Sequence, residues 1–207
     1  MTNQIAVFPS IRRSVGRWIM AGALTLAITV PMTALPSFAD SCRLQQLIPL
    51  LGLTTDERAV GTVAYLALSF EERSDRSGLI VHFQNGPGRF SRMAQTSTEQ
   101  EICRAARPLW LPTDSWSVAL AVPYAGTTIY GESLSAMVGV SVAAMAMGHT
   151  IAPGVVLTGT ITPEGSIGSV GGVLLKVAAA GQAHMRQVLV PDQANLADVD
   201  WSTPLRR

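Results

Sequence analysis

Charged side chains are scarce in this chain of 207 residues, and lysine is almost absent. Charged residues make up 14% of the sequence, and 14 of the 15 basic residues are arginine, so Lys176 is the single lysine. Residues 40–207 hold 12 basic and 14 acidic residues, a net charge of −2. Nucleic-acid-binding surfaces need a clustered excess of basic side chains, so we expect no nucleic-acid partner. The hydrophobic share of 48% is too high for a disordered protein and predicts one folded core.

Several motifs that mark metal and catalytic sites are also missing. The three histidines form no HExxH motif or close pair, and neither cysteine lies in a CxxC motif, so we expect no bound metal and no cofactor. No GxSxG motif supports a Ser-His-Asp hydrolase. No GxxxxGKS or GxxxxGKT loop supports nucleotide binding.

Residues 1–39 have the pattern of a secretory signal peptide. Three arginines are the only charged residues here, and an uncharged, mostly apolar run follows them at 18–30. The small residues Ser37 and Ala39 suit cleavage after Ala39. The apolar run has 13 residues, whereas about 20 are needed to span a bilayer as a helix. We therefore expect 40–207 to be exported, to the periplasm or the medium; an uncleaved membrane anchor is the alternative.

The expected export bears on the state of the two cysteines, Cys42 and Cys103. An even number of cysteines in an exported chain permits a disulfide, here between the new N-terminus and the middle of the chain. The alternative is two unpaired buried thiols, which behave as small apolar side chains.

The hydrophobic pattern after residue 40 predicts alternating strands and helices. The first two strands are expected to form a hairpin across the polar stretch 71–77. The loops 123–131 and 163–172 separate later elements. The resulting order predicts an α/β (α+β) sandwich, in which helices pack on a mixed sheet. The expected strands are 60–70, 78–84, 117–122, 154–162 and 187–190, and the expected helices are 94–107, 133–147 and 173–183.

Lys176 has apolar residues at almost every nearby position, from Gly171 to Ala180. Removing an ammonium from water lowers its pKa, and a neutral amine near pH 7 can act as a base. Arginine cannot take this role, because its pKa stays above about 12. The alternative is a lysine whose stem lies on apolar surface while its amine reaches water.

Ser133 is the best candidate for a nucleophile that such a base could activate. It follows Gly131 and Glu132 and opens the expected helix 133–147. A helix N-terminus offers unpaired N–H groups and a positive dipole end, which stabilise an oxyanion. The alternative is that Ser133 is only the N-cap of that helix.

These residues together resemble the proteolytic domain of Lon proteases. The resemblance is carried by Tyr130–Ser133, Leu157–Thr162 and Gly165–Ala180, and spans about residues 118–191. The 43-residue separation of Ser133 and Lys176 also matches that family. The resemblance implies that 40–207 form a Lon-like domain with a Ser–Lys dyad. Ser133 would be the nucleophile, Lys176 the base, and Thr158 would help to hold the lysine.

The resemblance also implies a function and partners. We expect a serine endopeptidase that acts on protein or peptide substrates and assembles as a homo-oligomeric ring. Glu132 replaces a usual proline, Tyr130 a usual acidic residue and Thr160 a usual glutamate, so the loop geometry and substrate preference differ. With no ATPase motif, we expect cleavage of unfolded or flexible segments without ATP; the need for a separate regulatory partner is left open. The alternative function is a catalytically silent Lon-like module that binds peptides or acts as a scaffold.

Overall fold

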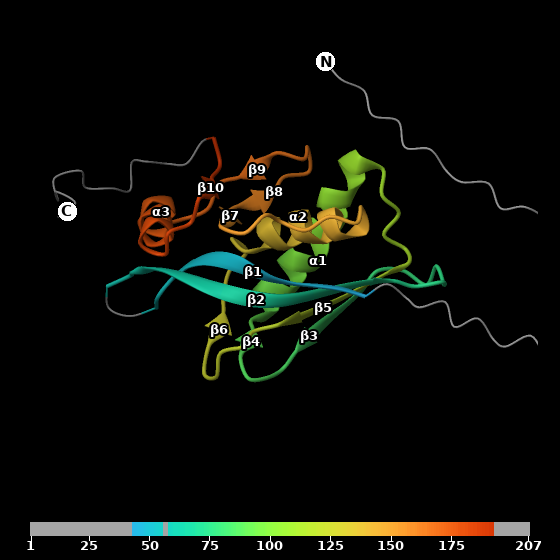
Figure 1. Cartoon of the computed structure of the whole chain (residues 1–207), viewed down its shortest axis with the longest axis horizontal. Coiled ribbons are helices and arrows are strands. Elements are labelled where there is room, and N and C mark those ends of the chain that lie inside the picture. Colours follow the sequence, from blue (N-terminus) through green and yellow to red (C-terminus); the bar gives the residue numbers. More distant parts are fainter. Residues whose placement is uncertain (1–42, 56–57, 193–207) are drawn as a thin grey trace, which may run out of the picture. The chain divides into compact units, whose positions relative to one another are not determined.

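A mixed four-stranded sheet is the largest sheet of the computed structural model, which describes residues 43–55 and 58–192 (Figure 1). The described residues belong to one unit, Ala39–Arg207. The expected signal peptide and Cys42 lie outside the described residues. Within the described ranges, no helix is long and apolar enough to cross a membrane. The same ranges hold no group of three or more side chains suited to a metal ion.

The sheet has the strand order β1-β2-β5-β3. β1 (Leu44–Leu53) and β2 (Gly61–Glu72) form an antiparallel hairpin, and β5 (Trp116–Ala121) runs antiparallel to β2. β3 (Ile80–Gln84) pairs in parallel with β5. The sheet is therefore mixed, and with its packed helices it gives the predicted α+β fold.

The predicted hairpin between β2 and β3 is wrong, because β5 lies between these two strands in the sheet. The polar stretch after β2 does not make a tight turn. Instead Arg73 donates its backbone N–H to Ser115 O and its guanidinium to Trp116 O, and Gly78 N donates to Asp114 O. These bonds join the stretch to the segment that leads into β5. The short, half-exposed β3 is thereby left at the edge of the sheet.

The sequence pattern missed β1 altogether. Its sequence, LQQLIPLLGL, has no regular alternation and contains Pro49, which lacks a backbone donor. Proline is tolerated in an edge strand, where one side of the backbone needs no partner. β1 is such an edge, with Pro49 opposite Tyr65 of β2.

The three predicted helices are confirmed, with bounds shifted by a few residues. They are α1 (Arg92–Ala106), α2 (Ser135–Ala146) and α3 (Val173–Gln182), and a short 3-10 turn, η1 (Arg107–Leu109), follows α1. Buried side chains of α1 and α2 share one core with the sheet. The two helices pack closely at Gly139, where a Cβ would lie 2.7 Å from the carbonyl oxygen of Glu101. Figure 1 shows α3 apart from this pair, beside the β1–β2 hairpin.

The predicted strand 154–162 is split into β7 (Val155–Leu157) and β8 (Thr160–Ile161). The break falls at Gly159, whose φ of 151° and close contacts with Ile167 and Gly168 exclude a side chain. β7 pairs in parallel with β10 (Gln187–Leu189), and β8 pairs with β9 (Ile167–Gly168). The two expected loops therefore contain short strands, since β6 (Thr128–Ile129) also pairs with β4 (Arg89–Phe90).

Candidate active site

A groove of about 810 Å³ lies between the β1–β2 hairpin, the segment that leads into α2, and α3. Uncharged side chains form nearly all of its lining. Among the described residues that line it, Lys176 is the only charged one. Most of the polar lining comes from threonine and tyrosine hydroxyls: Thr54, Thr55, Thr62, Thr127, Thr128, Tyr124 and Tyr130. The groove thus suits an uncharged segment of chain with hydrogen-bonding groups along it.

Ser133 lines this groove from the turn that precedes α2. The helix begins two residues later than predicted, with Leu134 as its N-cap residue and no side-chain capping bond. The N-cap alternative for Ser133 is therefore excluded. Its carbonyl accepts a hydrogen bond from Gly159 N at 3.2 Å, and Gly159 O accepts one from Ala136 N at 3.3 Å. This reciprocal pair binds the serine turn to the break between β7 and β8.

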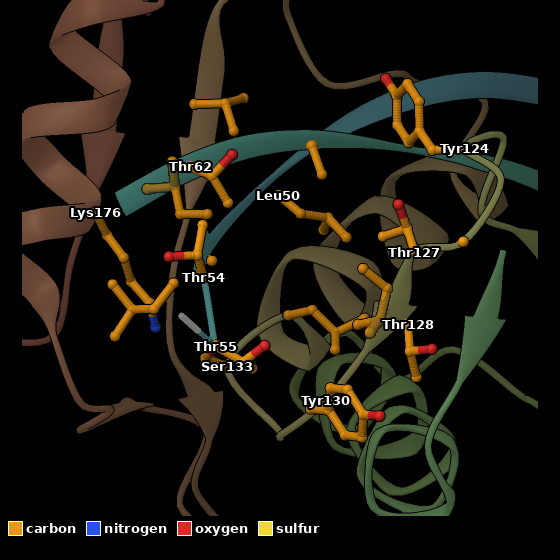
Figure 2. Close-up of a pocket in the computed structure, with 18 residues that line it drawn as sticks. Leu50, Thr54, Thr55, Thr62, Tyr124, Thr127, Thr128, Tyr130, Ser133 and Lys176 are labelled. Atoms are coloured by element: carbon orange, nitrogen blue, oxygen red, sulfur yellow. The ribbon is translucent and has the colours of Figure 1, made fainter. Parts of the chain in front are cut away.

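Lys176 enters the groove from the first turn of α3. The residue is only 3% exposed, so the alternative of an amine in open water is not what the structure shows. Burial lowers the pKa of the Lys176 amine from its ordinary value. Among the described residues, no carboxylate forms an ion pair with it. Figure 2 shows its side chain extending toward the end of the groove where Ser133 lies.

Two glycines let α3 approach the hairpin this closely. A Cβ at Gly61, the first residue of β2, would lie 2.5 Å from the carbonyl carbon of Leu175. Gly172 precedes α3 with a φ of 66°, and a Cβ there would lie 2.5 Å from Leu53. Both positions therefore favour glycine, and both control where Lys176 sits.

Thr158, the third predicted site residue, is fully buried and does not line the groove. Its backbone N–H donates to Leu189 O at 3.1 Å. Its hydroxyl oxygen has no hydrogen-bond partner among the described residues. The structure thus brings Ser133 and Lys176 to one groove, while the role of Thr158 toward the lysine stays a prediction.

Glu101 is a buried carboxyl that the sequence pattern missed. It is 2% exposed, and its Oε2 accepts a hydrogen bond from Ile161 N at 2.7 Å. Burial raises its pKa to about 7, although the nearby Ser135 hydroxyl and the hydrogen bond from Ile161 act in the opposite direction. Helical spacing from the buried residues Ala94 and Thr98 was the signal that could have found it.

Cys103 lies exposed on α1, so it does not match the alternative of two buried thiols. Its predicted partner Cys42 is outside the described residues, and the disulfide stays a prediction.

An α+β domain with a serine and a buried lysine on one uncharged groove has the parts needed for nucleophilic catalysis. Comparison with known families gives the class a name. Residues 112–203 match the Lon protease (S16) C-terminal proteolytic domain, so this part of the chain is similar to that family.

Two curated relatives agree with this assignment. The chain is 36% identical over 80 residues to "Lon protease homolog 2, peroxisomal" of Kluyveromyces lactis. This matched segment is 39% of the chain and 8% of the relative. The chain is also 35% identical over 95 residues to "Lon protease 2" of Syntrophobacter fumaroxidans. This second matched segment is 45% of the chain and 12% of the relative. The matched segments are thus small parts of these relatives. Both of these relatives are named as proteases.

Proposed function

We propose that the protein is a serine endopeptidase in which Ser133 is the nucleophile and Lys176 is the general base. The observation that carries this proposal is the groove itself, which Ser133 and a buried Lys176 without an ion-pair partner among the described residues both line. A lysine with a lowered pKa is a base near neutral pH, and a serine needs such a base because its hydroxyl is a weak nucleophile.

The reaction proceeds in two halves. The neutral Lys176 amine takes the proton of Ser133 Oγ as that oxygen attacks the scissile carbonyl carbon, and the ammonium then gives the proton to the leaving amine. The resulting acyl-enzyme ester is hydrolysed when Lys176 takes a proton from water. The attacking hydroxide releases the acid product and Ser133 regains its proton.

The turn that carries Ser133 also supplies donors for the developing oxyanion. Backbone N–H groups at Ser133 and Leu134 donate no hydrogen bond to the described residues. They lie just before α2, at the positive end of the helix dipole. Donors of this kind stabilise a tetrahedral intermediate.

The threonine-lined groove suits an extended segment of an unfolded or flexible protein. The sequence contains no phosphate-binding loop, so we infer that this chain cleaves such segments without ATP. We further infer that Thr158 supports the lysine, that residues 1–39 direct export, and that the domain assembles as a homo-oligomeric ring. Mass measurement in solution that gives only a monomer contradicts the ring.

Incubation of the protein with casein in the absence of ATP, followed by mass spectrometry of the products, tests the proposal. We expect cleavage by the parent protein and none by Ser133→Ala. Lys176→Arg is also expected to be inactive, because it keeps a positive charge but cannot lose its proton near pH 7.

Ser141→Ala is the matched control, since Ser141 is a buried serine of α2 that lies outside the groove and donates to Met137 O at 2.7 Å. It should retain cleavage. If the folded parent binds peptides but cleaves none of them, the silent binding module is the better description.

A further inference from the structure

Glu101 joins two segments that are far apart in sequence and meet at Ser133. On one side its Oε2 accepts from Ile161 N in β8, at 2.7 Å. On the other side its carboxyl lies near the hydroxyl of Ser135, the first residue of α2, which acts to lower its pKa. The same Ser135 hydroxyl donates a short hydrogen bond to the carbonyl of Glu132, the residue before Ser133.

The bonds around Glu101 close a ring through the proposed active site. From Ile161 the chain leads back two residues to Gly159, whose N–H donates to Ser133 O and whose carbonyl accepts from Ala136 N. Ser135 lies between Ser133 and Ala136 in the chain, and its hydroxyl is again near Glu101. The links of the ring are hydrogen bonds, short stretches of backbone and this contact between Ser135 and Glu101. Displacement of Glu101 should therefore displace the turn that carries Ser133.

Packing alone does not account for a carboxyl at this position. Glu101 is 2% exposed, and α1 approaches α2 here so closely that only glycine fits at position 139. Burial of a carboxyl is unfavourable unless its oxygens are used, and an apolar side chain would fill the same space without that penalty. The polar contacts of Glu101 are thus the feature that a function must explain.

We propose that Glu101 is a positioning residue for Ser133, because its contacts with Ser135 and Ile161 hold the turn 132–135 in register with the segment 159–161. This inference rests on the proposed function for its effect on hydrolysis.

Protonation of Glu101 changes these contacts. The protonated carboxyl can donate to Ser135 Oγ, so that the hydroxyl proton of Ser135 stays on the Glu132 carbonyl. The ionised carboxylate instead competes for that same proton, while Ile161 N donates to it in either state. The pKa of about 7 makes both states accessible near neutral pH.

Few other charged groups influence the protonation of Glu101. The Glu132 carboxylate raises the pKa of Glu101 and the Arg104 guanidinium lowers it. α2 and β8, which pack against α1, carry no ionisable side chain, and η1 carries only Arg107.

Peptide hydrolysis by the full protein, measured from pH 5 to pH 9, tests the proposal with three variants. Glu101→Leu should lower kcat by about 10- to 100-fold with little change in KM, because the groove itself is intact. Glu101→Gln keeps an acceptor for Ile161 and a donor for Ser135. It should therefore retain kcat within about threefold and lose the part of the pH profile that titrates near pH 7. Thr98→Val, at a fully buried position of the same helix, should match the parent.

Amide hydrogen exchange separates failure of this inference from failure of the proposed function. Glu101→Leu should speed exchange at Gly159, Ala136 and Ile161, and Thr98→Val should not, whether or not the parent cleaves peptides. Parent-like kcat together with parent-like exchange in folded Glu101→Leu would overturn the inference. An inactive parent with the expected exchange pattern would overturn only the catalytic role of Ser133.

Discussion

Replacement of Gly61 by alanine is expected to slow hydrolysis from a position that contributes no side chain to the groove. Gly61 opens β2 opposite Leu53, and α3 packs directly on it. A Cβ here would lie 2.5 Å from the carbonyl carbon of Leu175, whereas ordinary contacts begin at 3.4 Å. The obstacle is helix backbone, which cannot rotate aside as a side chain can. Leu175 is also the residue before Lys176, so the displacement is delivered to the proposed base.

The size of the effect follows from these distances. Relief of the contact needs a movement of α3 by more than about 1 Å, because the carbonyl oxygen of Leu175 lies closer still than its carbonyl carbon, and a misplacement of about 1 Å in a catalytic group can lower the rate about 10²-fold. Overpacking of this kind also reduces the free energy of unfolding by about 1–3 kcal/mol. We therefore expect Gly61→Ala to fold, to lose a few kcal/mol of stability at most, and to have a kcat lower by about 10²-fold.

Peptide hydrolysis and urea unfolding, measured on the same preparations, check both numbers. Gly181→Ala is the matched control, because Gly181 is in α3 and a Cβ there has nothing within 4 Å. That variant should keep the parent kcat and gain stability, by up to about 1 kcal/mol, since alanine favours a helix more than glycine does. Full activity in Gly61→Ala would refute the idea that the placement of α3 limits the reaction.

Three further predictions concern buried polar groups. Lys176→Met should raise the free energy of unfolding, because a desolvated amine is removed, while hydrolysis falls by roughly 10²- to 10⁴-fold; urea unfolding with a peptide assay measures both, and lower stability would contradict it. Thr158→Val should raise the free energy of unfolding by about 1 kcal/mol in urea unfolding, since the buried Thr158 hydroxyl has no hydrogen-bond partner among the described residues. A fall of similar size in the free energy of unfolding would instead show that the hydroxyl has a partner. Glu101 has a folded pKa raised from 4.5 to about 7, so its proton stabilises the fold fully below about pH 4.5, and that contribution is lost as the pH rises through 7. The loss amounts to about 3 kcal/mol between roughly pH 4 and pH 8. Glu101→Gln should lack this component in urea unfolding at several pH values, and parallel pH curves for the two proteins would contradict the shift.

Local pattern was enough to predict the three helices and the burial of Lys176. Each depends on the character of a contiguous stretch: small apolar residues around the whole of α2, and apolar neighbours on both sides of the lysine. Where the chain's own composition decides the structure, a sequence pattern can be trusted. The association of Ser133 with Lys176 was beyond such pattern and came from the family resemblance.

The strand order and the carboxyl at position 101 depend on partners that are distant in sequence. β5 lies between β2 and β3 because Arg73 and Gly78 bond to the segment before β5, about 40 residues further along the chain. β1 was missed because it contains Pro49. Proline is tolerated in a strand at the edge of a sheet, and which strand is the edge depends on the whole strand order. Glu101 looks like a surface residue of a helix until Ile161, 60 residues away, supplies its donor.

The burial of the single lysine has a consequence for how the protein can be handled chemically. Reagents that acylate primary amines, such as succinimidyl esters, have one side-chain target in the whole sequence, and that target is 3% exposed at the proposed centre of reaction. Apart from the α-amino group, labelling or surface attachment through amines must therefore enter the groove. Cys103, exposed on α1 and absent from the groove lining, is in its reduced form the better place for a dye or a tether.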